Sequence, residues 1–161
     1  MFHKLSTSKK SQFCFLCIFF GGVLLIMSGC TKKIDQPTPL ESLETKKPFS
    51  LSVKCENTVI KSGETLDIFC SLKNNSSMAY RINQEIELIN FKIDGEVTPY
   101  ISVAKKNTIM GNSEISRTIS IQVNELGTHD ITIFSNFDVI DEDDHILNNY
   151  CIEVPITVTV E

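Results

Sequence analysis

Apolar residues recur at every second position along most of the chain after residue 48. The segment FSLSVKCE places Phe49, Leu51, Val53 and Cys55 on one side and polar residues on the other. The segment TLDIFCSLKN repeats the pattern, and KSGE between the two segments is a turn signal. Because successive side chains of a strand point to opposite faces of a sheet, this alternation predicts strands with one buried face.

The same period of two continues to the end of the chain. Further strands are predicted in YRIN, IELINFKID, EVTPYISV, EISRTISIQV, THDITIFSNFDV and YCIEVPITVTV. The dipeptide Asp94-Gly95 joins two of them and suits the positive φ values of a tight hairpin. Ile115 and Ile119 are four residues apart, as in a helix. The spacing of two continues after them and β-branched residues dominate, so a strand is favoured there as well.

About seven antiparallel strands in residues 49–161 predict an all-β domain, either a two-sheet sandwich or a small barrel, with the sandwich favoured. The segments VIKSGETLDIFCSLKNNSS, LGTHDITIF and PITVTVE resemble the turns and strands of immunoglobulin-like domains of bacterial surface proteins. This resemblance implies an immunoglobulin-like antiparallel β-sandwich. The chain has no Trp, so the buried strand-C Trp of antibody domains is absent.

The N-terminal segment has the pattern of an export signal. Three lysines precede an apolar run from Phe13 to Met27, which is shorter than the roughly 20 residues of a membrane-spanning helix. The run ends at Ser28-Gly29-Cys30, which resembles the lipobox of bacterial lipoproteins, although the family usually has Leu where this chain has Met27. The resemblance implies that residues 1–29 are a signal peptide and that Cys30 becomes the diacylated, membrane-anchored N-terminus. An ordinary secretory signal is the alternative.

Residues 30–48 read as a linker. They contain three prolines and four lysines and almost nothing that could be buried. We therefore expect a flexible tether with a root-mean-square span of about 20 to 25 Å. Together with the lipobox, this tether implies a domain held at the outer face of the cytoplasmic membrane.

The charge balance excludes one class of partner. Residues 1–29 hold three of the fifteen basic residues and none of the twenty acidic ones, so the remaining chain is strongly acidic. Nucleic acids and other polyanions need clustered Lys and Arg on one face. The sequence therefore predicts no nucleic-acid binding.

Three cysteines remain in the expected domain, Cys55, Cys70 and Cys151. Their spacing does not match a zinc site, whose ligands come in closely spaced pairs. If Ser62-Gly63 is the centre of a two-residue hairpin loop, Cys55 lies directly opposite Cys70, and a disulfide between them is possible. Three unpaired thiols are the alternative. Cys151 falls on the phase that points away from the core.

The densest cluster of potential ligands is DVIDEDDH, a weak candidate for a calcium site. The alternating Asp spacing of an EF-hand and its turn glycine are missing, so a solvated hairpin tip with unpaired charges is the favoured interpretation. The candidate ligands are Asp138, Asp141, Asp143 and Asp144.

No catalytic constellation emerges from the sequence. His129 and Asp130 are adjacent in a predicted strand and so point to opposite faces, and no nucleophile motif or glycine-rich phosphate loop occurs. We therefore expect a non-enzymatic protein without a cofactor. The favoured function is a membrane-anchored binding or accessory module for a protein, peptide or cell-wall component. The alternatives are a surface protease inhibitor and a weak calcium-binding or metal-dependent surface protein.

Overall fold

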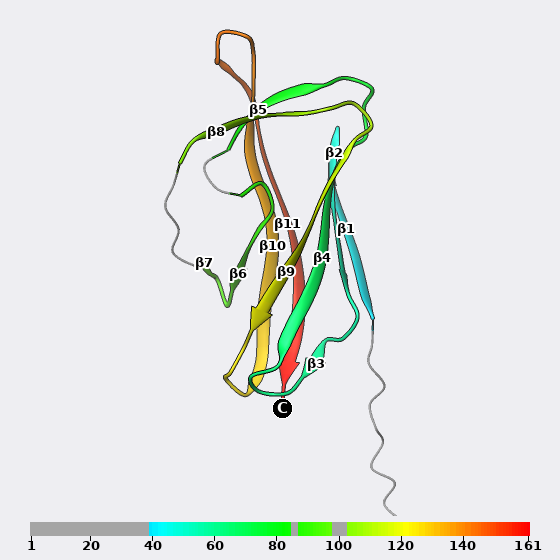
Figure 1. The fold of residues 1–161 in the computed structure, drawn as a ribbon, viewed down its shortest axis with the longest axis vertical. Coiled ribbons are helices and arrows are strands. Elements are labelled where there is room, and N and C mark those ends of the chain that lie inside the picture. The colour runs from blue at the N-terminus through cyan, green and yellow to red at the C-terminus, as the bar shows by residue number, and fades with distance from the viewer. Residues whose placement is uncertain (1–38, 85–86, 98–102) are drawn as a thin grey trace, which may run out of the picture. The chain divides into compact units, whose positions relative to one another are not determined.

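The computed structural model describes residues 39–84, 87–97 and 103–161, which belong to one compact unit (Figure 1). These residues form strands joined by turns, and none of them is helical, so no helix among them could span a membrane. The strands are β1 (Leu40–Lys46), β2 (Phe49–Cys55), β3 (Val59–Ile60), β4 (Thr65–Asn74), β5 (Tyr80–Gln84), β6 (Asn90–Ile93), β7 (Glu96–Val97), β8 (Lys105–Ile109), β9 (Glu114–Gln122), β10 (Gly127–Ile140) and β11 (Ile146–Val160).

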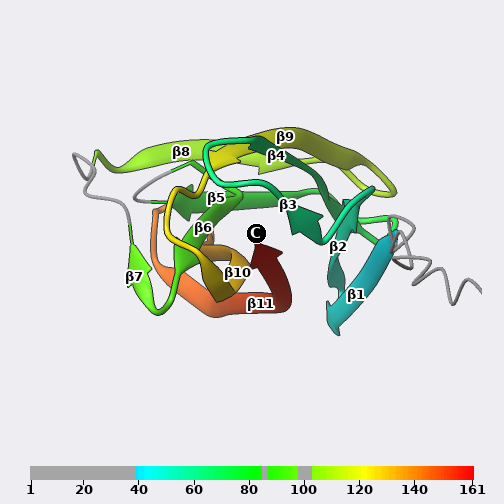
Figure 2. The same ribbon diagram turned by 90° about the horizontal axis from the view of Figure 1, so that it is seen from below.

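The strands form two sheets that pack face to face. One sheet has the order β1-β2-β4-β9, and the other has the order β3-β11-β10-β5-β8, with β6 pairing to β10 and β7 to β6. All pairs are antiparallel except β3 and β11. Strands β2, β4 and β9 lie in one sheet and β5, β10 and β11 in the other, which is the arrangement of an immunoglobulin-like sandwich. The predicted fold class is confirmed (Figure 2).

The core consists of the inward-facing residues that the alternation indicated. Burial of each such side chain contributes about 1.5 to 3 kcal/mol relative to its exposed state. The first sheet supplies Phe49, Leu51, Val53, Ile68 and Leu72, and the second supplies Ile131, Ile133, Ile152, Val154 and Val158. All of these side chains are essentially inaccessible to water.

The predicted hairpin turn at Asp94-Gly95 is confirmed. The two residues have φ values of 51° and 83°, and they join β6 to β7 with Ile93 opposite Glu96. Of the strand predicted in EVTPYISV, β7 accounts for Glu96–Val97, and residues 98–102 lie outside the described part. Strand β8 was not predicted, because four of its five side chains are exposed and so give no alternation.

The predicted tether over residues 30–48 is wrong for Leu40–Lys46, which form β1. This strand pairs with β2 from Leu40 opposite Cys55 to Lys46 opposite Phe49. Most of its side chains are exposed, so its composition resembles that of a linker. Backbone pairing with β2 holds the strand instead. Residues 30–38, including Cys30, and the signal segment 1–29 lie outside the described residues.

The predicted register of β2 against β4 is also wrong. Cys55 lies opposite Ile68, and Val53 lies opposite Cys70, so the two cysteines are diagonal neighbours. The physical reason is β3, since the chain crosses to the other sheet after β2 and only then returns to begin β4. A two-residue hairpin therefore does not join β2 to β4, and Cys55 and Cys70 are unpaired thiols.

We expect all three thiols of the domain to be alkylated without reductant, but in two stages. Burial raises the pKa of the Cys70 thiol to about 12 and also raises the pKa of Cys55. Both thiols should therefore resist iodoacetamide until the protein is unfolded in urea, since the thiolate is the reactive form. Cys151 is half-buried on the outward phase and should react in the folded protein. Peptide mapping checks this, and a Cys55–Cys70 linked peptide would contradict it.

Candidate binding surface

The two ends of the sandwich carry different parts of the chain. Leu40, where β1 begins, lies opposite the last residue of β2, and the C-terminal residue Glu161 bonds to Ile60 and Ser62 at the same end. The opposite end carries the connections 47–48, 75–79, 110–113 and 141–145 (Figure 1). We call this opposite end the distal end, because it lies farthest from the point where the chain enters the domain.

Asn74, the last residue of β4, organises two of the distal connections. Its side chain is fully buried, and its Nδ2 donates to the carbonyl oxygens of Met78 at 2.7 Å and Met110 at 3.0 Å. Its Oδ1 accepts from the backbone N and the hydroxyl of Ser76, both at 3.0 Å. The amide therefore uses its full hydrogen-bonding capacity to hold the two connections together.

Gly111 allows these two connections to approach each other closely. A Cβ atom at this position would lie 2.1 Å from the carbonyl oxygen of Ser77, so no other residue fits without a backbone shift. The backbone N of Asn112 donates to the carbonyl of Ser76 at 2.7 Å, and that of Asn74 donates to Ser113 at 3.0 Å. The distal connections are therefore locked to each other by their backbones.

Two methionine side chains project from this locked frame. Their carbonyl oxygens share one amide nitrogen, so the two residues are neighbours, and their side chains are 64% (Met78) and 59% (Met110) exposed. We call Met78 and Met110 the distal patch. Methionine is unbranched and polarisable and so adapts to different apolar partners. Ile146 and Leu147, also exposed, add apolar surface next to the turn of the β10–β11 hairpin.

An aromatic cluster lies beneath the distal connections. The ring of Phe49 contacts Tyr80, Phe137 and Tyr150 in edge-to-face geometry, with centroid distances of 5.3, 5.0 and 5.0 Å. Phe49 belongs to one sheet and the other three residues to the second. Each such ring pair adds about 0.5 to 1.5 kcal/mol beyond burial, so the cluster fixes the two sheets together where the connections begin.

The acidic segment forms the turn between β10 and β11, as predicted, but the expectation of unpaired charges is wrong for Asp141 and Asp144. Asp141 Oδ1 accepts from the backbone N atoms of Asp143 at 2.9 Å and His145 at 2.8 Å, which closes the turn. Asp144 forms ion pairs with Arg81 of β5 and Lys106 of β8. These bonds lower the pKa of Asp141, mainly through the His145 backbone N–H, and that of Asp144, mainly through Lys106.

The calcium candidate is not assembled in the described residues. Asp138 accepts a hydrogen bond from Asn149 at 2.8 Å, while the carboxylate of Asp141 closes the turn and that of Asp144 forms ion pairs. No group of three or more His, Cys, Asp or Glu side chains suited to a metal ion occurs in residues 39–84, 87–97 and 103–161. The alternative of a weak metal site at Asp138, Asp141, Asp143 and Asp144 therefore has no structural support.

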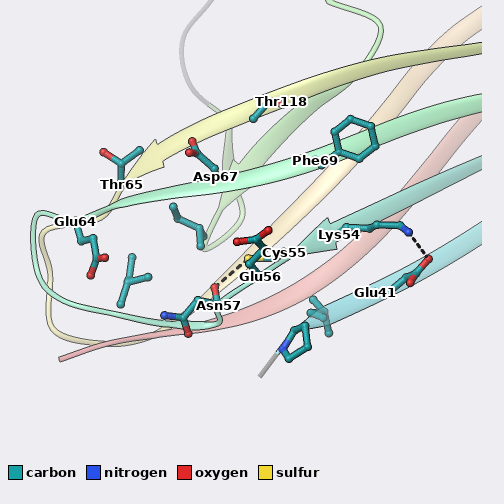
Figure 3. A pocket seen from close by; sticks show the side chains of 14 residues that line it. Glu41, Lys54, Cys55, Glu56, Asn57, Glu64, Thr65, Asp67, Phe69 and Thr118 are labelled. Carbon is teal, nitrogen blue, oxygen red and sulfur yellow. Dashed lines mark hydrogen bonds and ion pairs between the residues drawn. The ribbon is translucent and has the colours of Figure 1, made fainter. Parts of the chain in front are cut away.

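A groove of about 750 Å³ lies at the end opposite the distal patch (Figure 3). Its lining includes the Glu41–Lys54 ion pair, at 3.0 Å, and the half-exposed ring of Phe69. The thiol of Cys55 reaches it but donates to the Asn57 carbonyl at 2.9 Å, and its raised pKa keeps it protonated. Among the described residues that line it, no histidine stands beside this thiol to act as a base. The residues described along the groove therefore do not combine an activated nucleophile with a general base.

Comparisons with known proteins add little. No family model matches the chain, and no curated protein matches it. A crystal structure of a CARDB domain from Pyrococcus furiosus in complex with di-metal ions is 14% identical, with a TM-score of 0.46, and covers 76% of this chain and 93% of that one. The solution structure of the same domain is 15% identical, with a TM-score of 0.45 and coverages of 78% and 97%.

A β-glucosidase from Listeria innocua in complex with glucose is 17% identical to this chain. The match covers 74% of this chain but only 16% of the enzyme, with a TM-score of 0.37. Similarity at this level carries no information on function.

The distal patch was missed at the level of sequence, although one signal pointed to it. Asn74 continues the inward phase of Leu66, Ile68, Cys70 and Leu72, so the alternation indicates that its polar side chain is buried in the core. A buried amide needs hydrogen-bond partners, and the following connection supplies them. The second connection, which contains Met110, lies thirty-six residues away and could not be assigned without the fold.

We expect Asn74→Ala to destabilise the protein by about 1 to 3 kcal/mol, because the Met78 and Met110 carbonyls lose a buried donor. Urea unfolding measures this. The matched control is Asn107→Ala, since Asn107 is exposed on β8 and its side-chain oxygen accepts from the adjacent Thr108 amide. Equal stability of the two variants would contradict the role of Asn74.

We expect Asp141→Ala to lower the melting temperature at neutral pH, with Asp143→Ala as the near-neutral control. The pKa of Asp141 is lowered in the folded state. Its contribution is therefore present above the unfolded value near 3.8 and is lost as the pH falls through the folded pKa. Melting curves from pH 7 to pH 3 should converge for wild type and Asp141→Ala. A parallel offset at every pH, or a melting temperature raised by calcium, would contradict this account.

Proposed function

We propose that this protein is a bacterial lipoprotein in which diacylated Cys30 anchors an immunoglobulin-like, non-catalytic binding module at the outer face of the cytoplasmic membrane. We further propose that the distal patch contacts a protein partner. The lipobox-like Ser28-Gly29-Cys30 supports the anchor. The placement of exposed apolar side chains at the end opposite the chain entry supports the binding role.

The observation that carries the binding role is the preorganisation of Met78 and Met110. Two exposed apolar side chains on ordinary loops would lose conformational freedom on binding. Here Asn74 and Gly111 have already fixed the backbones that present them. A partner therefore gains apolar burial at a reduced ordering cost.

The dimensions of the chain suit a module of this kind. The segment from Cys30 to Pro39 reaches at most about 30 Å when fully extended. Strand β11 has 15 residues and runs from the distal end to the chain-entry end, which corresponds to about 50 Å. The distal patch thus lies about one length of β11 from the point where the chain enters the domain.

Charge indicates the kind of partner surface. Glu142 and Asp143 are exposed at the tip of the β10–β11 hairpin, near exposed Ile146 and Leu147. A protein surface with an apolar centre and basic residues at its rim complements this arrangement. The acidic balance of the chain disfavours an anionic polymer as the ligand.

Metabolic labelling with a fatty acid tests the anchor. We expect label on the wild-type protein and none on Cys30→Ala, which should also leave the membrane fraction, because stable anchoring requires two or more acyl chains. Cys151→Ala is the control and should be labelled like the wild type. Equal labelling of Cys30→Ala would refute lipidation at this residue.

Site-specific photocrosslinking in intact cells tests the binding surface. We expect a photoreactive residue at position 78 or 110 to give a discrete protein adduct. Position 126 is the matched control, since Leu126 is a 67% exposed apolar residue at the other end of the sandwich. Adducts from position 126 and none from positions 78 and 110 would contradict the distal patch as the contact.

A further inference from the structure

A buried histidine lies where the β6–β7 hairpin meets β10. His129 is 6% exposed, and its Nδ1 lies 2.8 Å from Asp94 Oδ2. Its Nε2 lies 2.9 Å from the carbonyl oxygen of Glu125, in the connection before β10. As the sequence predicted, the ring does not engage the neighbouring Asp130 side chain, which bonds to Thr157 instead.

The partners of the ring define its protonation. A carboxylate oxygen and a carbonyl oxygen are both acceptors, and a neutral imidazole carries a single N–H. Both contacts can be hydrogen bonds together when the ring is an imidazolium. Deprotonation replaces one of them with a contact between two acceptors, which costs free energy in a site shielded from water.

Asp94 transmits this interaction to the hairpin. It occupies the β6–β7 turn with a φ of 51°, and its other oxygen, Oδ1, accepts from the backbone N of Asp130 at 2.9 Å. Its own backbone N donates to the carbonyl of Asp130 at 2.8 Å. The turn is therefore fastened to the start of β10 by one residue that also binds the histidine ring.

We propose that the His129 imidazolium is a proton-dependent clamp that docks the β6–β7 hairpin onto β10, and that the docking loosens when His129 loses its proton. The clamp helps to hold the core together, because Phe91 and Ile93 of β6 pack against the core cluster. In the ladder these two residues lie opposite Ile133 and Ile131 of β10. Loosening of the hairpin would partly expose these two side chains.

The electrostatics around the ring agree with the geometry. The Asp94 hydrogen bond raises the pKa of His129, with a further contribution from the Glu125 carbonyl, and the negative charges of Asp94 and Glu125 act in the same direction. The same hydrogen bond lowers the pKa of Asp94.

These two shifts define the pH range of the clamp. The His129 contribution is complete below the unfolded value near 6.5 and is lost as the pH rises through the folded pKa. The Asp94 contribution is present above about 3.8 and is lost as the pH falls through its folded pKa. The clamp is therefore strongest in mild acid.

NMR titration of the full chain in detergent micelles tests the clamp. We expect His129 to titrate at a higher pH in the folded protein than in urea, with each pH unit of difference corresponding to about a tenfold change in the docking equilibrium. Protection factors of the Asp94 and Asp130 amides, corrected for intrinsic exchange, should fall by the same factor across the His129 titration. Identical folded and unfolded midpoints would overturn the proposal.

The variant Asp94→Asn separates the clamp from the turn. Asparagine tolerates positive φ and can still accept from the Asp130 amide, but it carries no charge. We expect the His129 midpoint to fall and the pH dependence of the amide protection to disappear. Asp143→Asn removes an exposed carboxylate of the hairpin tip and should change neither. Unchanged His129 behaviour in Asp94→Asn would show that the clamp does not operate.

Discussion

The packing of Phe49 between the two sheets is the interaction on which the distal end depends. Phe49 lies directly opposite Asn74 in the β2–β4 ladder, and both side chains are fully buried. Phe49 packs on the aromatic rings of the second sheet, and Asn74 binds the carbonyls of Met78 and Met110. A single cross-strand pair thus joins the sheets and also supports the surface that presents the distal patch.

Local periodicity predicted the parts of the fold in which burial alternates. The inward phases of β2, β4, β10 and β11 and the Asp94-Gly95 turn are correct because each depends on a few neighbouring residues. Strand β1 was not predicted because its side chains are mostly exposed and backbone pairing with β2 holds it in place. The predicted β2–β4 register is wrong because the crossover at β3 follows from a pairing with residues of β11 that lie one hundred positions later in the chain.

The same distinction applies to the candidate sites. Asp144 carries an apparently solvated charge in sequence, but its ion-pair partners Arg81 and Lys106 come from two other strands. The distal patch depends on the meeting of two connections far apart in the chain. Such sites are properties of topology. Asn74 could be recognised from the sequence as a polar residue at a buried position, but the groups that surround it could not be predicted.

Two of the strands at sheet edges carry features that oppose strand pairing with another chain. Strand β9 ends one sheet, and Arg117 lies on its inward phase and donates to the Ile89 carbonyl at 2.8 Å. An inward-directed charge on an edge strand opposes pairing with another chain. In the other sheet, Pro155 of β11 lacks a backbone donor and opposes pairing along the part of β11 that β3 does not cover.

Hydroxyl-radical footprinting of intact cells tests the central claim most directly, because the residues of the distal patch are themselves sensitive probes. The account predicts that Met78 and Met110 oxidise more slowly on the cell surface, where the partner is present, than in the purified full-length protein. Phe69, half-exposed on the outer face of the other end, should be modified at the same rate in both. Equal oxidation of the two methionines in cells and in isolation would contradict the distal patch as a binding surface.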